Sequence, residues 1–303
     1  MSPGRRPAGA PEPRPDFRGL LRRHGIRPDK RLGQHFLFEP AALERVLAAA
    51  ELTGNETVLE IGAGVGSLTL QLAAAARKVI AVEVDPRLIP ALREAVADRP
   101  NIELVVGDIL RLDLPGLIGG SPYVVVANIP YYITSHLLRR LLETPARAAR
   151  LVLTVQEEVA ERVTAEAGKH SLLALGVQLY GSAVVAGRIP AGAFHPPPAV
   201  DSAILVVRVH ERPRIAPDLI APFFLLARAG FNQKRKQLRN SLSRGLGVEG
   251  NVVAEWIEAA GLRPDCRAED LGLKEWERLL SAARPGGIKW PAGDRPGSAG
   301  GEA

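Results

Sequence analysis

The stretch Thr57-Val58-Leu59-Glu60-Ile61-Gly62-Ala63-Gly64-Val65-Gly66 decides the fold that this chain is expected to adopt. Its first five residues are mostly apolar, which is typical of a buried strand in a parallel sheet. The three glycines permit a tight turn and a close approach of the backbone to a ligand. A helix is predicted directly afterwards, over residues 67–76. The stretch therefore predicts a strand–turn–helix unit with a ligand site at the carboxyl end of the strand.

The alternation of strand and helix continues along the chain. Further strands are predicted at 78–83, 102–106, 123–126 and 151–155, and further helices at 40–50, 86–97, 135–142, 156–167 and 171–180. Such alternation predicts an α/β fold with a doubly wound, Rossmann-like parallel sheet. Two more strands, at 183–186 and 203–207, are expected to close the sheet as a hairpin pair.

Composition shifts divide the chain into four regions. Residues 1–29 form a basic arm, whose first 16 residues are expected to be disordered and whose residues 17–27 predict a short helix ending at Gly25. Residues 30–210 form the α/β domain. Residues 211–283 predict only helices, at 218–230, 233–244, 251–260 and 274–283, and therefore a small all-helical domain. The Gly- and Pro-rich tail, 284–303, is expected to be disordered.

Charge and cysteine content narrow the class of protein. The net charge is +6, and residues 1–34 carry nine Arg or Lys against three acids. Residues 231–244 carry five more cations, among them Lys234, Arg235, Lys236 and Arg239, and no acid. Concentrated basic stretches favour a nucleic-acid partner, although a solvated basic surface would have the same composition. A single cysteine, scattered histidines and no long apolar run predict no disulfide, no metal site, no membrane span and a cytoplasmic protein.

Polar residues follow the strands at what would be one edge of the sheet. Glu83 ends the strand after the glycine turn, where a carboxylate can accept both hydroxyls of a ribose. Asp108 follows the next strand and can accept from an adenine amino group, although a simple Gly-Asp turn is the competing interpretation. The spacing G-x-G-x-G differs from the G-x-G-x-x-G of dinucleotide sites, which favours S-adenosylmethionine over NAD.

The stretch Ala127-Asn128-Ile129-Pro130-Tyr131-Tyr132 follows the strand at 123–126. Asn128 can accept a hydrogen bond through its side-chain oxygen, Pro130 directs the neighbouring carbonyls, and Tyr131 offers a face for stacking. This set suits a planar ring with an exocyclic amino group, such as adenine. An ordinary Asn-X-Pro turn at a strand end is the alternative.

Five motifs together resemble a known family. They are Leu32-Gly33-Gln34-His35-Phe36-Leu37, Glu60-Ile61-Gly62-Ala63-Gly64, Asn128-Ile129-Pro130-Tyr131-Tyr132-Ile133, Phe194-His195-Pro196-Pro197-Pro198-Ala199-Val200-Asp201-Ser202 and Phe231-Asn232-Gln233-Lys234-Arg235-Lys236-Gln237-Leu238-Arg239-Asn240. They resemble the KsgA-type small-subunit rRNA adenine dimethyltransferases, which are related to the Erm 23S rRNA methyltransferases. His35 stands where many members have Asn, but both side chains can hydrogen-bond a ligand.

The resemblance implies a class I methyltransferase fold and contacts to S-adenosylmethionine from His35, Leu37, Gly62, Gly64, Glu83, Asp108 and Asn128. It implies two adjacent adenosines near the 3′ end of 16S rRNA, in the small ribosomal subunit, as the substrate. Asn128, Ile129, Pro130 and Tyr131 would receive the target base. Phe194 would stack on its other face, unless it is simply a core aromatic residue.

Three other functions stay open at this point. An Erm-type enzyme would act on 23S rRNA, and an assembly factor would act mainly by binding the small subunit. An NAD oxidoreductase is disfavoured by the glycine spacing. For RNA binding, a helix over 233–244 would carry Arg235 and Arg239 on one face, with Lys236 adjacent. We expect the protein to work as a monomer.

Overall fold

The computed structural model describes residues 15–166, 168–233 and 235–283. The two tails expected to be disordered, apart from residues 15 and 16, and Lys234 of the basic stretch lie outside these ranges. In the part of the chain that the structure describes, no helix is long and apolar enough to cross a membrane.

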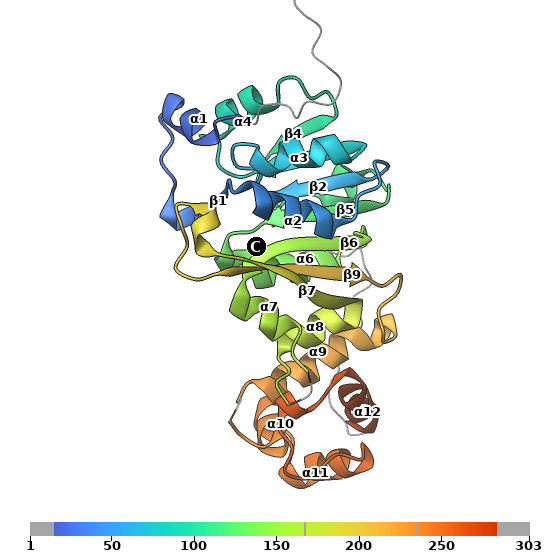
Figure 1. Cartoon of the computed structure of the whole chain (residues 1–303). Helices are drawn as coiled ribbons and strands as arrows, with labels where there is room; N and C mark the ends of the chain where they lie inside the picture. Colours follow the sequence, from blue (N-terminus) through green and yellow to red (C-terminus); the bar gives the residue numbers. More distant parts are fainter. Residues whose placement is uncertain (1–14, 167, 234, 284–303) are drawn as a thin grey trace, which may run out of the picture.

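A seven-stranded sheet forms the centre of the molecule (Figure 1). Its strands in chain order are β2 (Thr57–Ile61), β3 (Lys78–Glu83), β4 (Ile102–Val106), β5 (Tyr123–Asn128), β6 (Arg150–Gln156), β7 (Gly181–Ile189) and β9 (Ser202–Val209). The spatial order is β4-β3-β2-β5-β6-β9-β7, and β2 to β6 are parallel. The chain first builds outward from β2 to β4 and then restarts at β5, on the other side of β2. This reversal creates a crevice at the carboxyl ends of β2 and β5, where such sheets bind ligands.

Strands β7 and β9 confirm the expected closing pair. They pair antiparallel with each other, and β9 also pairs antiparallel with β6. Each strand is longer at both ends than the apolar runs at 183–186 and 203–207 predict, because ladder hydrogen bonds extend beyond the apolar side chains. The antiparallel strands complete a mixed sheet around a parallel centre.

Helices cover both faces of the sheet. One face carries α2 (Pro40–Ala50), α3 (Ser67–Ala75) and α4 (Ile89–Val96), and the other carries α5 (Leu114–Ile118), α6 (Thr134–Glu143), α7 (Glu157–Val163) and α8 (Leu172–Tyr180). Helix α2 has the predicted bounds because Pro40 occupies its first turn and the Glu39 carboxylate accepts from the free N–H groups of Ala41 and Ala42. The five-residue α5 was not predicted, because it is too short for a periodic pattern.

The segment before the sheet also contributes structure beside the crevice. Helix α1 (Phe17–Arg23) ends two residues before the predicted Gly25, and it is followed by the 3₁₀ turn η1 (Lys30–Leu32). A two-residue strand, β1 (Phe36–Leu37), pairs antiparallel with β8 (Phe194–His195). This small pairing joins two motifs that are almost 160 residues apart in the sequence. It places both at the crevice end of the sheet (Figure 1).

The C-terminal helices are α9 (Pro217–Phe231), α10 (Leu238–Leu246), α11 (Gly250–Ala259) and α12 (Leu273–Ala283). They pack below α8 in Figure 1. One cluster of buried side chains runs without a break from the sheet through α8 and α9 to Trp276, whose side chain is fully buried. A domain boundary at residue 211 therefore stays a prediction, since the two parts share a core.

The predicted helix over residues 233–244 is wrong in its first turn. Helix α9 continues to Phe231, a turn follows, and α10 begins only at Leu238. The backbone N–H of Leu238 donates to the Cys266 carbonyl instead of continuing a helix. Arg235 and Lys236 therefore lie in an exposed turn and not on a shared helical face with Arg239.

Candidate functional site

The glycine turn after β2 forms the floor of the crevice. Gly62, Gly64 and Gly66 all have positive φ, at 78°, 61° and 91°. A Cβ atom on Gly62 would stand 3.3 Å from the Asn128 carbonyl oxygen, and one on Gly64 would stand 3.1 Å from the Phe36 ring. The turn therefore needs glycine for its backbone angles and also because two other motifs lie against it.

Glu83 lies at the end of β3, with only 5% of its surface exposed. One carboxylate oxygen accepts from the Gly64 N–H at 2.7 Å, and the other accepts from the N–H groups of Val84 and Asp85, both at 2.9 Å. Burial raises the pKa of Glu83, while these three backbone donors act in the opposite direction. Glu83 thus shapes the glycine turn as well as lining the cavity beside it.

Asp108 follows β4 by two residues and lies at the same edge of the sheet as Glu83. Its Oδ1 accepts from the Leu110 N–H at 2.9 Å, and 41% of its side chain is exposed. Asp108 therefore begins a turn, as the competing interpretation of a Gly-Asp turn predicted. It also lines the cavity. The two interpretations are compatible because a carboxylate has four acceptor positions.

Asn128 and His35 hold the other wall of the crevice in place. The Asn128 Nδ2 donates to the His35 backbone carbonyl at 2.8 Å. Its Oδ1 accepts no hydrogen bond from any residue that the structure describes, so this oxygen remains available to a ligand. The His35 ring is fixed in turn by a 2.7 Å hydrogen bond between Nδ1 and the Pro196 carbonyl.

Tyr131 is half-buried and offers less surface than its position in the sequence indicates. Its hydroxyl group shares a 2.8 Å hydrogen bond with Ser202 Oγ, and the His35 ring stacks against it at a centroid distance of 6.0 Å. The neighbouring Tyr132 is the more exposed ring, with 62% of its surface accessible. Ile129 and Pro130 line the cavity beside these rings.

Two residues named from the sequence do not line the cavity. The Leu37 side chain is 2% exposed and packs in the core under α2 and α3, with its carbonyl accepting from Ser67 Oγ at 2.8 Å. Phe194 is 3% exposed and belongs to the same core. The expectation that Phe194 is an exposed stacking residue is therefore wrong for this structure. Pairing of β8 with β1 turns its ring inward, and the Pro-rich segment itself begins only at Pro196.

Two further residues were not singled out from the sequence as site residues. Gln34 donates from Nε2 to Asp85 Oδ2 at 2.8 Å and so connects the segment before β1 to the end of β3. Asp85 is 3% exposed, and its pKa is lowered mainly by its ion pair with Arg87. The position of Asp85, two residues after Glu83, was the sequence signal that could have identified it as a site residue. These contacts hold one rim of the crevice.

Glu60 is the most unusual acid in the structure. It is 1% exposed, and neither carboxylate oxygen has a hydrogen-bond partner among the described residues. Burial raises its pKa to about 8; the nearby Thr69 hydroxyl opposes this effect and the charge of Glu83 adds to it. Burial therefore favours the neutral form of this carboxyl group, which lies directly before the glycine turn.

The cavity at this edge has a volume of about 350 Å³, which is in the range of small-molecule sites. Nine of the residues named from the sequence line it: His35, Gly62, Gly64, Glu83, Asp108, Asn128, Ile129, Pro130 and Tyr131. The glycine cradle and the acids at two strand ends fit a nucleoside with a small charged substituent. Within the described ranges, no group of three or more His, Cys, Asp or Glu side chains could hold a metal ion.

Comparison with known proteins agrees with this geometry. Residues 26–281 match the family described as ribosomal RNA adenine dimethylase. A protein of Dehalococcoides mccartyi named ribosomal RNA small subunit methyltransferase A is 41% identical over 273 residues, which cover 90% of this chain and 94% of the relative. A protein of the same name from Moorella thermoacetica is 40% identical, over 86% of this chain and 94% of the relative.

Two solved structures are similar over most of the chain. The 23S rRNA methyltransferase ErmE has a TM-score of 0.66 at 30% identity and covers 82% of this chain and 98% of its own. A dimethyladenosine transferase from Plasmodium falciparum has a TM-score of 0.69 at 27% identity and covers 84% and 99%. With the family match across the sheet and the C-terminal helices, these similarities establish that the chain belongs to the ribosomal RNA adenine dimethylase family.

Proposed function

We propose that this protein uses S-adenosylmethionine to methylate, twice each, the N6 atoms of two adjacent adenosines near the 3′ end of 16S rRNA. The small-subunit assignment is supported by relatives that carry that name at about 40% identity over most of both chains. The similarity to ErmE is lower, at 30% identity, so a 23S rRNA target is not favoured. The observation that carries the chemistry is the free Oδ1 of Asn128 at the edge of the glycine-floored crevice.

We assign the cofactor to the crevice by its chemistry. Bound there, S-adenosylmethionine supplies an activated methyl group. Glu83 would accept from its ribose hydroxyls, and Asp108 would accept from its adenine amino group. Because Gly62 and Gly64 have no side chains, the cofactor could contact the protein backbone there. In the motif before the sheet, His35 lines the cavity, whereas Leu37 is buried in the core and its carbonyl already accepts from Ser67 Oγ.

The target adenosine would enter beside Asn128. Its amino nitrogen is a poor nucleophile, because the lone pair is delocalised into the ring. The free Oδ1 of Asn128 and the carbonyl of Ile129, which accepts no bond from a described residue, could each accept one N–H. Two such bonds favour a pyramidal nitrogen and orient it, so that positioning supplies most of the rate. Pro130 keeps the chain at this point in a fixed conformation.

Binding of the base requires that it leave its stack, which costs a few kcal/mol. Tyr131 has one ring face covered by His35, and it can offset part of this cost with the remaining surface. Phe194 contributes through the core that supports β1 and not by stacking. Arg235, Lys236 and Arg239 are exposed cations suited to phosphate contacts, and Lys234 belongs to the same proposal.

The proposed partner is the small ribosomal subunit, and the proposed place of action is the cytoplasm, with the protein acting as a monomer without a metal. A role as an assembly factor that works by binding remains compatible with this enzyme. The intact glycine turn, Glu83 and the free Asn128 oxygen favour catalysis over binding alone.

The test is single-turnover methyl transfer to small subunits from a strain that lacks the modification, with Asn128→Ala as the variant. We expect transfer to be lost while the affinity for S-adenosylmethionine falls only a few-fold. Asn55→Ala, an exposed asparagine before β2, is the matched control and should transfer normally. Transfer by Asn128→Ala within a few-fold of the wild-type rate would contradict the mechanism. No transfer by the wild-type protein would contradict the function itself.

A further inference from the structure

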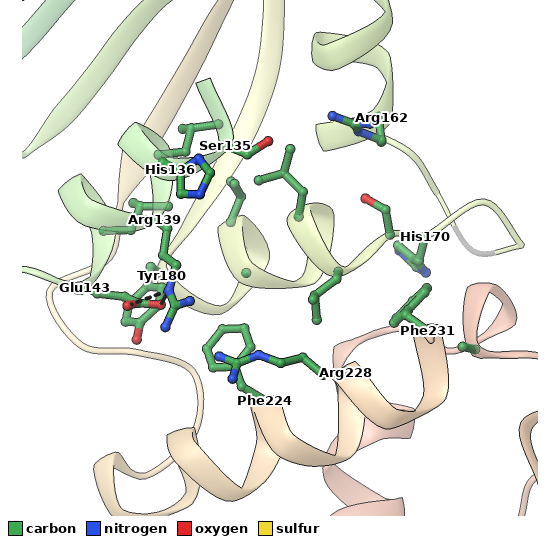
Figure 2. A pocket seen from close by; sticks show the side chains of 18 of the residues that line it. Ser135, His136, Arg139, Glu143, Arg162, His170, Tyr180, Phe224, Arg228 and Phe231 are labelled. Carbon is green, nitrogen blue, oxygen red and sulfur yellow. Dashed lines mark hydrogen bonds and ion pairs between the residues drawn. The ribbon is translucent and has the colours of Figure 1, made fainter. Parts of the chain in front are cut away.

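A larger cavity, of about 650 Å³, lies outside the cofactor crevice (Figure 2). Helix α8 forms its floor, and helices α6 and α9 form its two long sides. We call it the interhelical groove. Neither the glycine turn nor any strand end lines it, so the proposed chemistry does not account for it.

Positive charge is in excess along the interhelical groove. Its charged lining consists of Arg139, Arg162, Lys169, Arg228, Glu143 and Glu269. Both acids of the groove already form ion pairs. Glu143 pairs with Arg139 at 2.9 Å, and Glu269 lies 3.8 Å from Arg267. Arg162, Lys169 and Arg228 form no ion pair with any residue that the structure describes. Three cations therefore remain for an anionic ligand.

Aromatic and apolar surface lies between these charges. Phe224, Arg228 and Phe231 follow one face of α9 at spacings of four and three residues. The Arg228 guanidinium carbon lies 5.8 Å from the centre of the Phe224 ring. On the floor, Leu172 and Gly176 of α8 are half-buried. A flat group could lie against this surface with an anion beside it, which is the combination that single-stranded nucleic acid requires.

Two residues that line the interhelical groove each carry a buried polar atom without a hydrogen-bond partner. His170 is 9% exposed and its Nδ1 makes no hydrogen bond, and the Arg162 Nε is likewise buried and unpaired. Burial lowers the pKa of His170, against the raising effects of Glu275 and the Leu271 backbone. Buried polar atoms are satisfied in nearly all folded proteins. These two atoms are therefore exceptions, and both belong to residues that line the groove.

The interhelical groove begins next to the proposed acceptor site. The turn η2 (Tyr131–Ile133) leads directly into α6, so that Ile133 lines the cofactor crevice and Ser135 lines the groove. On the opposite side, Phe231 ends α9 and lines the groove just before the exposed turn that carries Arg235 and Lys236. A strand leaving the crevice would therefore meet the groove between two proposed RNA-contacting segments.

We propose that the interhelical groove holds the single-stranded rRNA next to the target adenosines. Its phosphates would contact Arg228, Lys169 and Arg162, and one unstacked base would lie on Phe224. Stacked duplex is disfavoured because its bases are not available to the Phe224 ring. The inference rests on the proposed function, since it takes rRNA as the substrate.

The first test measures binding of unmethylated small subunits over a salt series. We expect Arg228→Glu with Lys169→Glu to weaken binding at least tenfold, and to make the log–log salt slope shallower by about 0.7 for each lost phosphate contact. The matched control is Arg45→Glu with Arg93→Glu, the same charge change on the exposed surfaces of α2 and α4. If both double variants lost the same affinity for the subunits, the effect would come from long-range charge and not from contacts in the groove. That result would overturn the proposal.

The second test separates stacking from charge. Phe224→Ala should weaken binding about tenfold with an unchanged salt slope, whereas Phe224→Leu controls for the loss of apolar volume. Affinity for S-adenosylmethionine should stay unchanged in both, which also shows that the variants are folded. The proposal would be overturned if Phe224→Ala and the Arg228/Lys169 variant both bound small subunits with wild-type affinity.

Naked rRNA distinguishes RNA from a protein partner. If the Arg228/Lys169 variant binds a protein-free 3′ fragment of 16S rRNA normally but binds whole subunits poorly, the groove holds an acidic ribosomal protein segment and not RNA. A failure of the proposed function is recognised separately, because the wild-type protein would then not methylate the subunits at all.

Discussion

The buried carboxyl group of Glu60 should make the stability of this protein depend on pH in an unusual direction. Its pKa of about 8 lies well above the ordinary 4.5 of a glutamate. At 1.36 kcal/mol for each pH unit, this difference corresponds to at most about 5 kcal/mol. The raised pKa means that the folded state holds the proton more tightly than the unfolded chain does. The stabilisation is therefore complete below pH 4.5 and is lost as the pH rises to about 8.

The variant that tests this reasoning is Glu60→Gln, which keeps the shape of the side chain and cannot ionise. We expect the wild-type protein to lose several kcal/mol of unfolding free energy relative to Glu60→Gln between pH 5 and pH 9. Urea unfolding at each pH measures the difference. Subtracting the two curves removes most of the contribution of Glu83, whose pKa burial raises in the same direction.

Glu158→Gln on α7 is the control, because this glutamate is exposed. Its unfolding free energy should follow the wild-type curve at every pH. A constant difference between wild type and Glu60→Gln from pH 5 to pH 9 would refute the reasoning. It would mean that Glu60 ionises normally, with water or a rearranged Thr69 hydroxyl solvating its charge.

Three further predictions follow from the crevice and the basic segment. Glu83→Ala removes the acceptor of three backbone N–H groups, so calorimetry should show weaker S-adenosylmethionine binding, by about 1.5–3 kcal/mol, together with a lower melting temperature; unchanged values in both would remove Glu83 from the site. Gly64→Ala should cost about 1–2 kcal/mol for its positive φ plus the cost of contact with the β1 aromatic ring, whereas Gly119→Ala, with positive φ but open space around it, should pay only the first cost. Equal melting temperatures for the two glycine variants would argue against that contact. Arg235→Glu with Arg239→Glu should weaken subunit binding and flatten its salt dependence without changing cofactor affinity, and a wild-type salt slope would place the RNA elsewhere.

Local patterns were enough to predict the central sheet. The strands at 57–61, 78–83 and 102–106 have the predicted bounds, because apolar runs flanked by Gly, Asp or Asn leave little choice of backbone. The helix at 40–50 was equally clear, since Pro40 and the residues around it specify its start. Parallel strands end at one edge, and this geometry alone brings Glu83, Asp108 and Asn128 to a common crevice.

Local patterns did not determine which side chains face that crevice. The three prolines that follow His195 predict an exposed Phe194, but the β1–β8 pairing buries its ring. This pairing depends on a contact between segments that are distant in the sequence. The helix over 233–244 was mispredicted because the tertiary contact of Leu238 with Cys266 sets where α10 starts. Propensity is a weak prior, and tertiary contacts override it.

The sequence by itself determined the sheet, the glycine turn and the identity of the polar groups at its edge. Only the tertiary structure decided that Asn128 Oδ1 is free, because the other end of that amide is held by the His35 carbonyl. It also decided that burial raises the pKa of Glu60 and that the interhelical groove exists. The physical reason is that hydrogen-bond partners, burial and cavities are properties of segments brought together by folding, and no single segment contains them.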